Sequence, residues 1–219
     1  MQIWQYVVAA LVALAVGAVV LLVMRQRHAP GGPDAGNSVE SSCTDPHEPA
    51  VVTPADALAA QPQAPPAAVR AAADALVDAE EPIAAPWLTP DFANDGRRIV
   101  LTDARVLVCA DAVASSRELW AALGQSQQRD QPLVVVAPEL AEEAALMLII
   151  NHRSGQASAL AVLAEDPVRA EIAAALGAEQ STAPDRQAGY LPADHWGRAE
   201  LWVSDRRHTW FRPAPRTAA

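Results

Sequence analysis

The stretch of residues 129–155, RDQPLVVVAPELAEEAALMLIINHRSG, constrains the fold of this chain more than any other part of it. Its first half contains an unbroken apolar run typical of a strand buried on both faces, and its second half has the periodicity of a helix. The helix ends in five consecutive apolar residues, Leu146 to Ile150. Each of them taken alone is best interpreted as core, but together they cover more than one helical turn. Some must therefore face something other than the sheet, such as a partner or a peptide.

Strands and helices alternate on both sides of this stretch. We expect short strands in 97–102 and 104–110 with a turn at Thr102–Asp103, a helix over 115–129 capped by Ser115 or Ser116, and a helix over 139–153. Further strands are expected in 131–137 and 158–164, a helix over 166–178, and a hairpin over 199–212. This order predicts a layered α/β domain over residues 83–212, followed by a disordered tail over 213–219.

The N-terminus has the length and composition of a membrane span. The run from Ile3 to Met24 is interrupted only by Gln5, and about twenty apolar residues in a helix cross the hydrocarbon core of a bilayer. We expect a retained anchor over residues 1–28 rather than a cleaved signal peptide, because no basic residue precedes the run. Arg25 and Arg27 follow it, which predicts a single-pass protein of the plasma (cell) membrane whose C-terminal domain is cytoplasmic.

Residues 29–82 have the composition of a flexible linker. This segment and the few residues after it, up to Pro90, hold eleven of the eighteen prolines and nine acidic residues against the single basic residue Arg70. Such a stretch buries too little apolar surface to offset its ordering entropy. Two pieces could be helical: 53–61, where Thr53 is a possible N-cap and Pro54 takes the first helical position, and 65–81, which has helical spacing. For the second, a transient helix and a docked helix are equally good interpretations.

Charge and cysteine content exclude several kinds of protein. A formal net charge of −10 is unsuited to binding nucleic acid. The two cysteines, Cys43 and Cys109, provide neither a disulfide framework nor a metal quartet. Cys109 lies inside an apolar strand and is interpreted as a small buried residue, and Trp196, Trp202 and Trp210 are interpreted as core rather than as an interface stripe.

Four motifs in order along the chain resemble the apical, substrate-binding domain of the group I chaperonins, the GroEL family. They are PWLTPDF at 86–92, ARVLVCADAVASSRELWAAL at 104–123, the strand–turn–helix at 131–155, and WGRAELWVSDRRHTWF at 196–211. The resemblance covers roughly residues 85–212. It does not extend to the equatorial ATPase domain of that family, and the chain has no phosphate-binding loop motif.

The resemblance implies that two neighbouring helices with an apolar rim bind non-native polypeptides, above a short aromatic segment. The residues that correspond to this site are Trp120 and Leu123 on the first helix, Ala145, Ile149, Ile150 and Asn151 on the second, and Trp87, Asp91 and Phe92 beneath. Ala145 and Asp91 depart from the family pattern, where larger apolar or aromatic residues stand. The site should therefore be smaller and less apolar at these positions.

No constellation for catalysis or for metal binding is apparent in the sequence. His152 and Ser154 are neighbours, but they are expected at a helix end, where a histidine favours the negative terminus. We therefore expect no enzyme activity and no cofactor. The leading hypothesis is a membrane-anchored module that binds a protein or peptide. The alternative is an accessory or assembly subunit of a membrane complex, in which Ala13, Gly17 and Ala18 pack against other helices and the apical-like domain is a scaffold.

Overall fold

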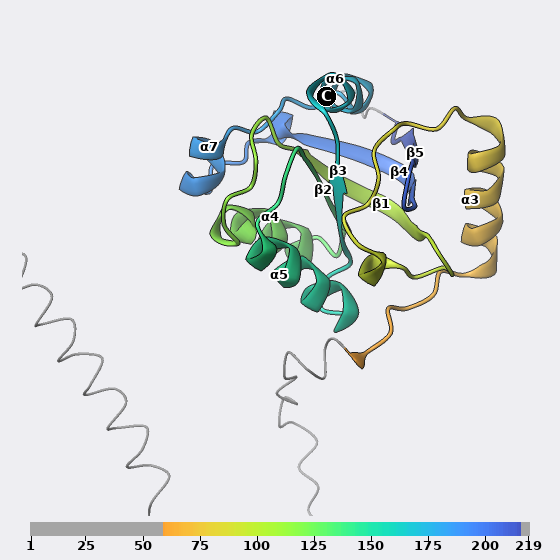
Figure 1. Cartoon of the computed structure of the whole chain (residues 1–219). Helices are drawn as coiled ribbons and strands as arrows, with labels where there is room; N and C mark the ends of the chain where they lie inside the picture. The colour runs from red at the N-terminus through yellow and green to blue at the C-terminus, as the bar shows by residue number, and fades with distance from the viewer. Residues whose placement is uncertain (1–58, 216–219) are drawn as a thin grey trace, which may run out of the picture. The chain divides into compact units, whose positions relative to one another are not determined.

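The computed structural model describes residues 59–215, and these form a five-stranded mixed sheet with helices packed on it (Figure 1). The strand order is β3-β2-β1-β4-β5. The strands are β1 (Ile99–Val108), β2 (Leu133–Ala137), β3 (Ala159–Leu163), β4 (Trp196–Ser204) and β5 (Thr209–Pro213). β1, β2 and β3 run parallel, whereas β4 and β5 pair antiparallel. The predicted α/β class is confirmed.

Two crossover helices link the parallel strands. α4 (Arg117–Gln128) lies between β1 and β2 in the chain, and α5 (Glu142–Arg153) lies between β2 and β3. Right-handed crossovers place successive helices on the same face of a sheet, and Figure 1 shows α4 and α5 side by side there. Each helix starts two or three residues later than predicted. In particular, Ser116 makes no side-chain cap, because its backbone conformation is already helical.

β1 is one strand, so the prediction of two short strands with a turn at Thr102–Asp103 is wrong. The strand pairs with β4 on both sides of Asp103, from Ile99 opposite Ser204 to Leu107 opposite Trp196. Asp103 adopts a positive φ of 50° without ending the strand. Aspartate tolerates this left-handed conformation better than most residues do, which explains why a turn-like dipeptide sits inside a strand.

The helix α3 (Ala67–Ala79) docks on the sheet on the side away from α4 and α5 (Figure 1). Ala73 and Leu76 are buried against Val100, Val203 and Trp210 and form a second, smaller core. Asp74 also pairs with Arg98, with 2.7 Å between Oδ1 and Nη2. These contacts decide between the two interpretations of residues 65–81 in favour of a docked helix. The domain boundary expected at residue 83 would separate α3 from the sheet on which it packs.

Residues 83–88 hydrogen-bond to both outermost strands of the sheet. Ile83 exchanges two backbone hydrogen bonds with Thr209 of β5, each 3.0 Å long. At the other end of the segment, the N–H of Leu88 donates to Ala161 of β3 at 2.9 Å, and Trp87 forms a bridge with Val162. One short segment therefore ties the antiparallel half of the sheet to the parallel half.

Two more helices complete the domain. α6 (Asp166–Leu176) ends at Gly177, whose φ of 65° is the left-handed conformation that ends many helices. α6 lies so close to β4 that a Cβ on Gly197 would stand 2.7 Å from the Cβ of Leu176. α7 (Ala183–Ala188) was not predicted from the sequence, since a helix of six residues has too few apolar positions to show a period.

The predicted membrane anchor over 1–28 and the first part of the linker, up to residue 58, lie outside the described residues, as do residues 216–219 of the tail. Within residues 59–215, none of the helices has the length and apolar content needed to span a bilayer.

Candidate peptide-binding face

α4 and α5 run side by side and are joined by a polar contact near each end. Near their N-termini, the backbone N–H of Ser116 donates to Glu143 Oε1 at 2.9 Å. Near their C-termini, Gln127 Nε2 donates to Asn151 Oδ1 at 3.4 Å. Since both helices begin and end at the same levels, they are parallel, as expected for crossovers between parallel strands. These contacts also identify which side of each helix faces the other.

Apolar side chains lie between these two polar contacts. The 3.6-residue period places Trp120 and Leu123 on the side of α4 that carries Ser116 and Gln127. On α5, the same period places Leu146, Met147 and Ile150 on the side that carries Glu143. We call the surface formed by these five apolar residues, Trp120, Leu123, Leu146, Met147 and Ile150, the α4–α5 face.

The α4–α5 face is unusually exposed for its composition. Among residues 59–215 only three large apolar side chains are strongly exposed, and two of them, Trp120 at 62% and Leu146 at 43%, belong to this face. Met147 and Ile150 are half-buried, and Leu123 is buried. Large exposed apolar side chains gathered on neighbouring helices commonly mark a binding site. The sequence indicated that part of the apolar run Leu146–Ile150 would face away from the sheet, and Leu146 is indeed exposed to solvent.

The remaining predicted site residues lie at the margin of the face or beneath it. Ala145 and Ile149 are at most 9% exposed, and Ile149 belongs to the main core. Trp87 and Phe92 are buried in the main core and offer little surface to a ligand, and Phe92 contacts His152 of α5. Asn151 is half-buried, and its Nδ2 also donates to the carbonyl oxygen of Met147 at 2.8 Å.

The C-terminal end of α5 is held by the short 3-10 helix η1 (Pro90–Phe92). The ring of Phe92 meets that of His152 edge-on at 6.0 Å between centroids, and Arg153 Nη1 lies 3.7 Å from Asp91 Oδ1. His152 does not act as a cation at the helix terminus as expected. Burial lowers its pKa to about 4, so it is neutral, and its Nδ1 accepts a hydrogen bond from the N–H of Ala159 at 3.3 Å.

A buried ion pair positions the N-terminal turn of α4. Arg186 of α7 approaches Glu118 Oε2 at 3.0 Å through both Nε and Nη2, and both side chains are almost fully buried. Arg186 also donates to the carbonyl oxygens of Ser181 and Ala112, while Glu118 Oε1 accepts the N–H of Ala114 at 3.1 Å. Because every charged atom has a partner, this network fixes the turn from which Trp120 projects.

Cys109 and the three C-terminal tryptophans are placed as the sequence predicted. Cys109 is fully buried, and burial raises the pKa of its thiol to about 12. Trp196, Trp202 and Trp210 are all at most 8% exposed. Cys109 is therefore not available on the surface for redox chemistry, and the three tryptophans do not form an exposed interface stripe.

Sequence reasoning passed over two residues of the α4–α5 face, Leu146 and Met147, although their apolar run carried the signal. It also missed three arginines that converge elsewhere in the domain, at Arg105, Arg129 and Arg198. The signal for the first of these was a charged residue inside the apolar strand ARVLVCA, at a position where burial is expected.

Comparisons with known proteins agree with the resemblance seen in the sequence. Chaperonin GroEL 5 of Bradyrhizobium diazoefficiens (strain JCM 10833 / BCRC 13528 / IAM 13628 / NBRC 14792 / USDA 110) is 36% identical to this chain over 80 residues, which are 36% of this chain and 15% of that chaperonin. No protein-family model matches the chain.

Solved chaperonin structures are also similar to the described domain. Two crystal forms of the chaperonin gp146 from the bacteriophage EL 2 (Pseudomonas aeruginosa), both in the presence of ATP-BeFx, match with TM-scores of 0.48 and 0.49 and sequence identities of 15% and 14%. Each match covers 61% of this chain and 28% of the chaperonin chain. This chain thus spans less than a third of the length of each of these chaperonins. The sequence match confirms that the chain carries a domain similar to the apical domain of the chaperonins.

Proposed function

We propose that this protein is a membrane-anchored module that binds a protein or peptide segment on the α4–α5 face, without an ATPase cycle of its own. The observation that carries the proposal is the exposure of Trp120 and Leu146 on two parallel helices within a chaperonin-apical-like domain. The membrane anchor and the cytoplasmic position of the domain are part of the proposal and rest on the sequence of residues 1–28.

The chemistry of the face favours a segment with apolar side chains. Trp120 and Leu146 supply apolar area, and burial of such area stabilises a complex by about 25 cal/mol per Å² before ordering costs. The polar contacts at the two ends of the face, Ser116 with Glu143 and Gln127 with Asn151, limit its length. A short amphipathic helix or an extended strand suits such a surface.

The experiment uses the full chain in lipid nanodiscs and a permanently unfolded client, reduced and carboxymethylated lactalbumin labelled with a fluorophore. We expect the Trp120→Glu variant to bind this client at least about tenfold more weakly than wild type, because a charge replaces a central aromatic contact. Fluorescence anisotropy titrations measure both dissociation constants.

Tyr190→Glu is the matched control. Tyr190 is as exposed as Trp120, at 61%, but it follows α7 and lies outside the α4–α5 face. This variant should bind the client like wild type. Equal weakening by both variants would mean that binding is not specific to the face.

The alternative function, an accessory or assembly subunit, gives a different result in the same preparation. A wild-type chain that ignores unfolded clients, yet purifies from its own membrane in a fixed ratio with one complex, would replace the proposal. The same α4–α5 face would then be the expected contact with that complex, and Trp120→Glu should release it.

A further inference from the structure

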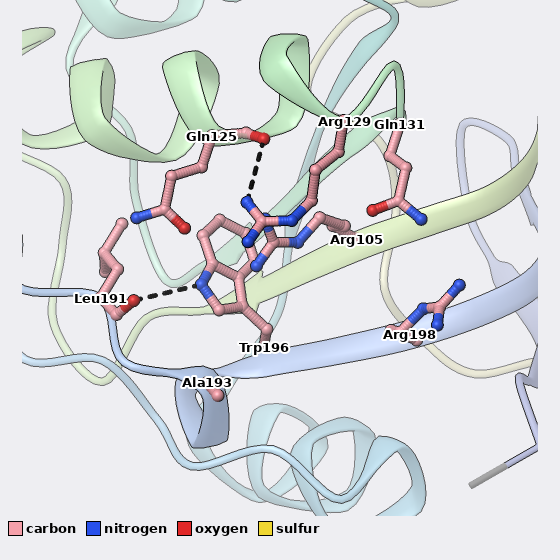
Figure 2. Close-up of a pocket in the computed structure, with 8 residues that line it drawn as sticks. All are labelled: Arg105, Gln125, Arg129, Gln131, Leu191, Ala193, Trp196 and Arg198. Atoms are coloured by element: carbon pink, nitrogen blue, oxygen red, sulfur yellow. Dashed lines mark hydrogen bonds between the residues drawn. The ribbon is translucent and has the colours of Figure 1, made fainter. Parts of the chain in front are cut away.

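A pocket of about 580 Å³ lies at the C-terminal end of α4, above β1 and β4 (Figure 2). Three arginines line it: Arg105 from β1, Arg129 from the end of α4, and Arg198 from β4. The rest of the lining consists of Gln125, Gln131, Leu191, Ala193 and Trp196. The pocket is distinct from the α4–α5 face, since they share no residue.

Arg105 is the central group of this pocket. Its guanidinium lies on the indole of Trp196, with 3.7 Å between Cζ and the ring centroid (Figure 2). The residue is only 7% exposed, and its buried Nη1 has no hydrogen-bond partner among the described residues. A buried guanidinium nitrogen without an acceptor is costly and is rarely left so in a folded protein.

The charges around Arg105 make the lack of an acceptor more significant. Among residues 59–215, neither Arg105 nor Arg129 forms a salt bridge, and only Arg198 is paired, with Asp103. Burial, followed by the neighbouring charges of Arg129 and Arg198, lowers the pKa of Arg105 to about 10. It is still a cation at neutral pH, so two positive charges face the pocket without a carboxylate in a chain whose net charge is −10.

We propose that this pocket binds a small molecule through a doubly charged oxyanion, a phosphate monoester group. The planar guanidinium fork matches the oxygens of a phosphate group in a bidentate manner. A dianion compensates the two unpaired cations, Arg105 and Arg129. The volume of the pocket exceeds that of one phosphate group, so the organic part of the ester lies against Leu191 and Trp196.

A hydrogen bond orients the side chain of Arg129 so that it can contact a phosphate group in the pocket. Its Nη1 donates to the backbone carbonyl of Gln125 at 3.4 Å (Figure 2). The side chain therefore folds back along the last turn of α4 toward the pocket, although Arg129 itself is exposed. The remaining guanidinium nitrogens of Arg129 have no hydrogen-bond partner in the described part of the chain and can donate to a ligand.

The experiment titrates the full chain, in nonionic detergent micelles, with inorganic phosphate, glycerol 3-phosphate and succinate at constant ionic strength by calorimetry. Glycerol 3-phosphate should bind at least as tightly as inorganic phosphate, and succinate more weakly. The Arg129→Gln variant should weaken phosphate binding by about fivefold or more, since one charged donor is lost. Arg97→Gln is the matched control, because Arg97 is exposed and lies outside the pocket.

A second measurement does not depend on substitution of a buried residue. Phosphate that binds only the folded chain raises its unfolding temperature relative to chloride at the same ionic strength, and Arg129→Gln should remove most of that rise. Absence of any binding at about 10 mM phosphate, or equal binding by the wild-type and Arg129→Gln chains, overturns the proposal. Tighter binding of succinate would overturn the choice of a phosphate group. Each of these results leaves the client titration at Trp120 unaffected.

Discussion

At the scale of single residues, the most consequential side chain beneath the proposed binding face is His152. Its imidazole is 4% exposed, it contacts the ring of Phe92, and its Nδ1 accepts the N–H of Ala159. Burial lowers its pKa to about 4 from the ordinary 6.5. In the range between these values the unfolded chain binds more protons than the folded chain, so acid favours unfolding.

We predict a specific loss of stability on mild acidification. Neutral His152 contributes fully to the free energy of unfolding above about pH 6.5, and this contribution is lost as the pH falls toward 4. At pH 5 the loss is about 2 kcal/mol. Urea unfolding at pH 7 and pH 5 should therefore show a smaller difference for His152→Gln than for wild type. The control is His208→Gln, since His208 is partly exposed. If wild type and His152→Gln lose stability equally, the buried imidazole is not the cause.

Glu118 and Arg186 form a buried ion pair that differs from the buried Arg105 in its hydrogen bonding. All of their charged atoms are hydrogen-bonded, whereas Nη1 of Arg105 lacks an acceptor within residues 59–215. A satisfied buried pair specifies one arrangement of α4 and α7. The contrast between the two sites is the reason that we assign a structural role to the first and a ligand to the second.

At the scale of elements, α3 depends on the sheet for its stability. A helix of thirteen residues is marginal in water by itself, and Leu76 is the largest side chain that it buries. Its core is separate from the main core of the domain. We therefore expect α3 to detach more readily than the main core unfolds.

We predict that Leu76→Ala releases α3 selectively. The loss of a buried leucine costs about 2–4 kcal/mol, which is a large share of what holds this helix. Hydrogen exchange should show that the amides of α3 lose protection while those of β2 keep it. Arg70→Ala, at an exposed position of the same helix, should leave both unchanged. Loss of protection in β2 as well would mean that the two cores unfold together.

The elements differ in how far the sequence could predict them. β2 and α5 were found because a fully apolar strand and a helical period are local signals. The docking of α3 could not be decided, because its partners Val100, Val203 and Trp210 are distant in the chain and only the fold brings them together. The same reason hid the arginine pocket, whose residues come from β1, α4 and β4. The exposure of Trp120 follows from its helical position, but its place opposite α5 needed the structure.

At the scale of the whole molecule, residues 1–28 predict a membrane anchor with the C-terminal domain on the cytoplasmic side. The two cysteines allow it to be tested. Cys109 is buried, with its thiol pKa raised to about 12, so it does not react with maleimides in the folded protein. Labelling therefore reports on Cys43 alone, which follows the proposed anchor in the sequence.

We predict that a membrane-impermeant maleimide does not label this protein in intact cells and does label it after permeabilisation, because Arg25 and Arg27 keep the C-terminal side in the cytoplasm. Mass-tag gel shifts measure the labelled fraction. The Cys43→Ser variant should remain unlabelled in both conditions. Labelling in intact cells would place residue 43 and the domain outside.

The segment 83–88, which hydrogen-bonds to β5 at Ile83 and to β3 at Leu88, has a consequence for solubility. Free backbone groups along the border of a sheet recruit strands from other molecules and can lead to aggregates. Here residues 83–88 occupy part of the outer edge of β5 and part of the outer edge of β3. If the α4–α5 face binds unfolded chains as proposed, this segment also hinders those chains from pairing with the two outermost strands of the sheet.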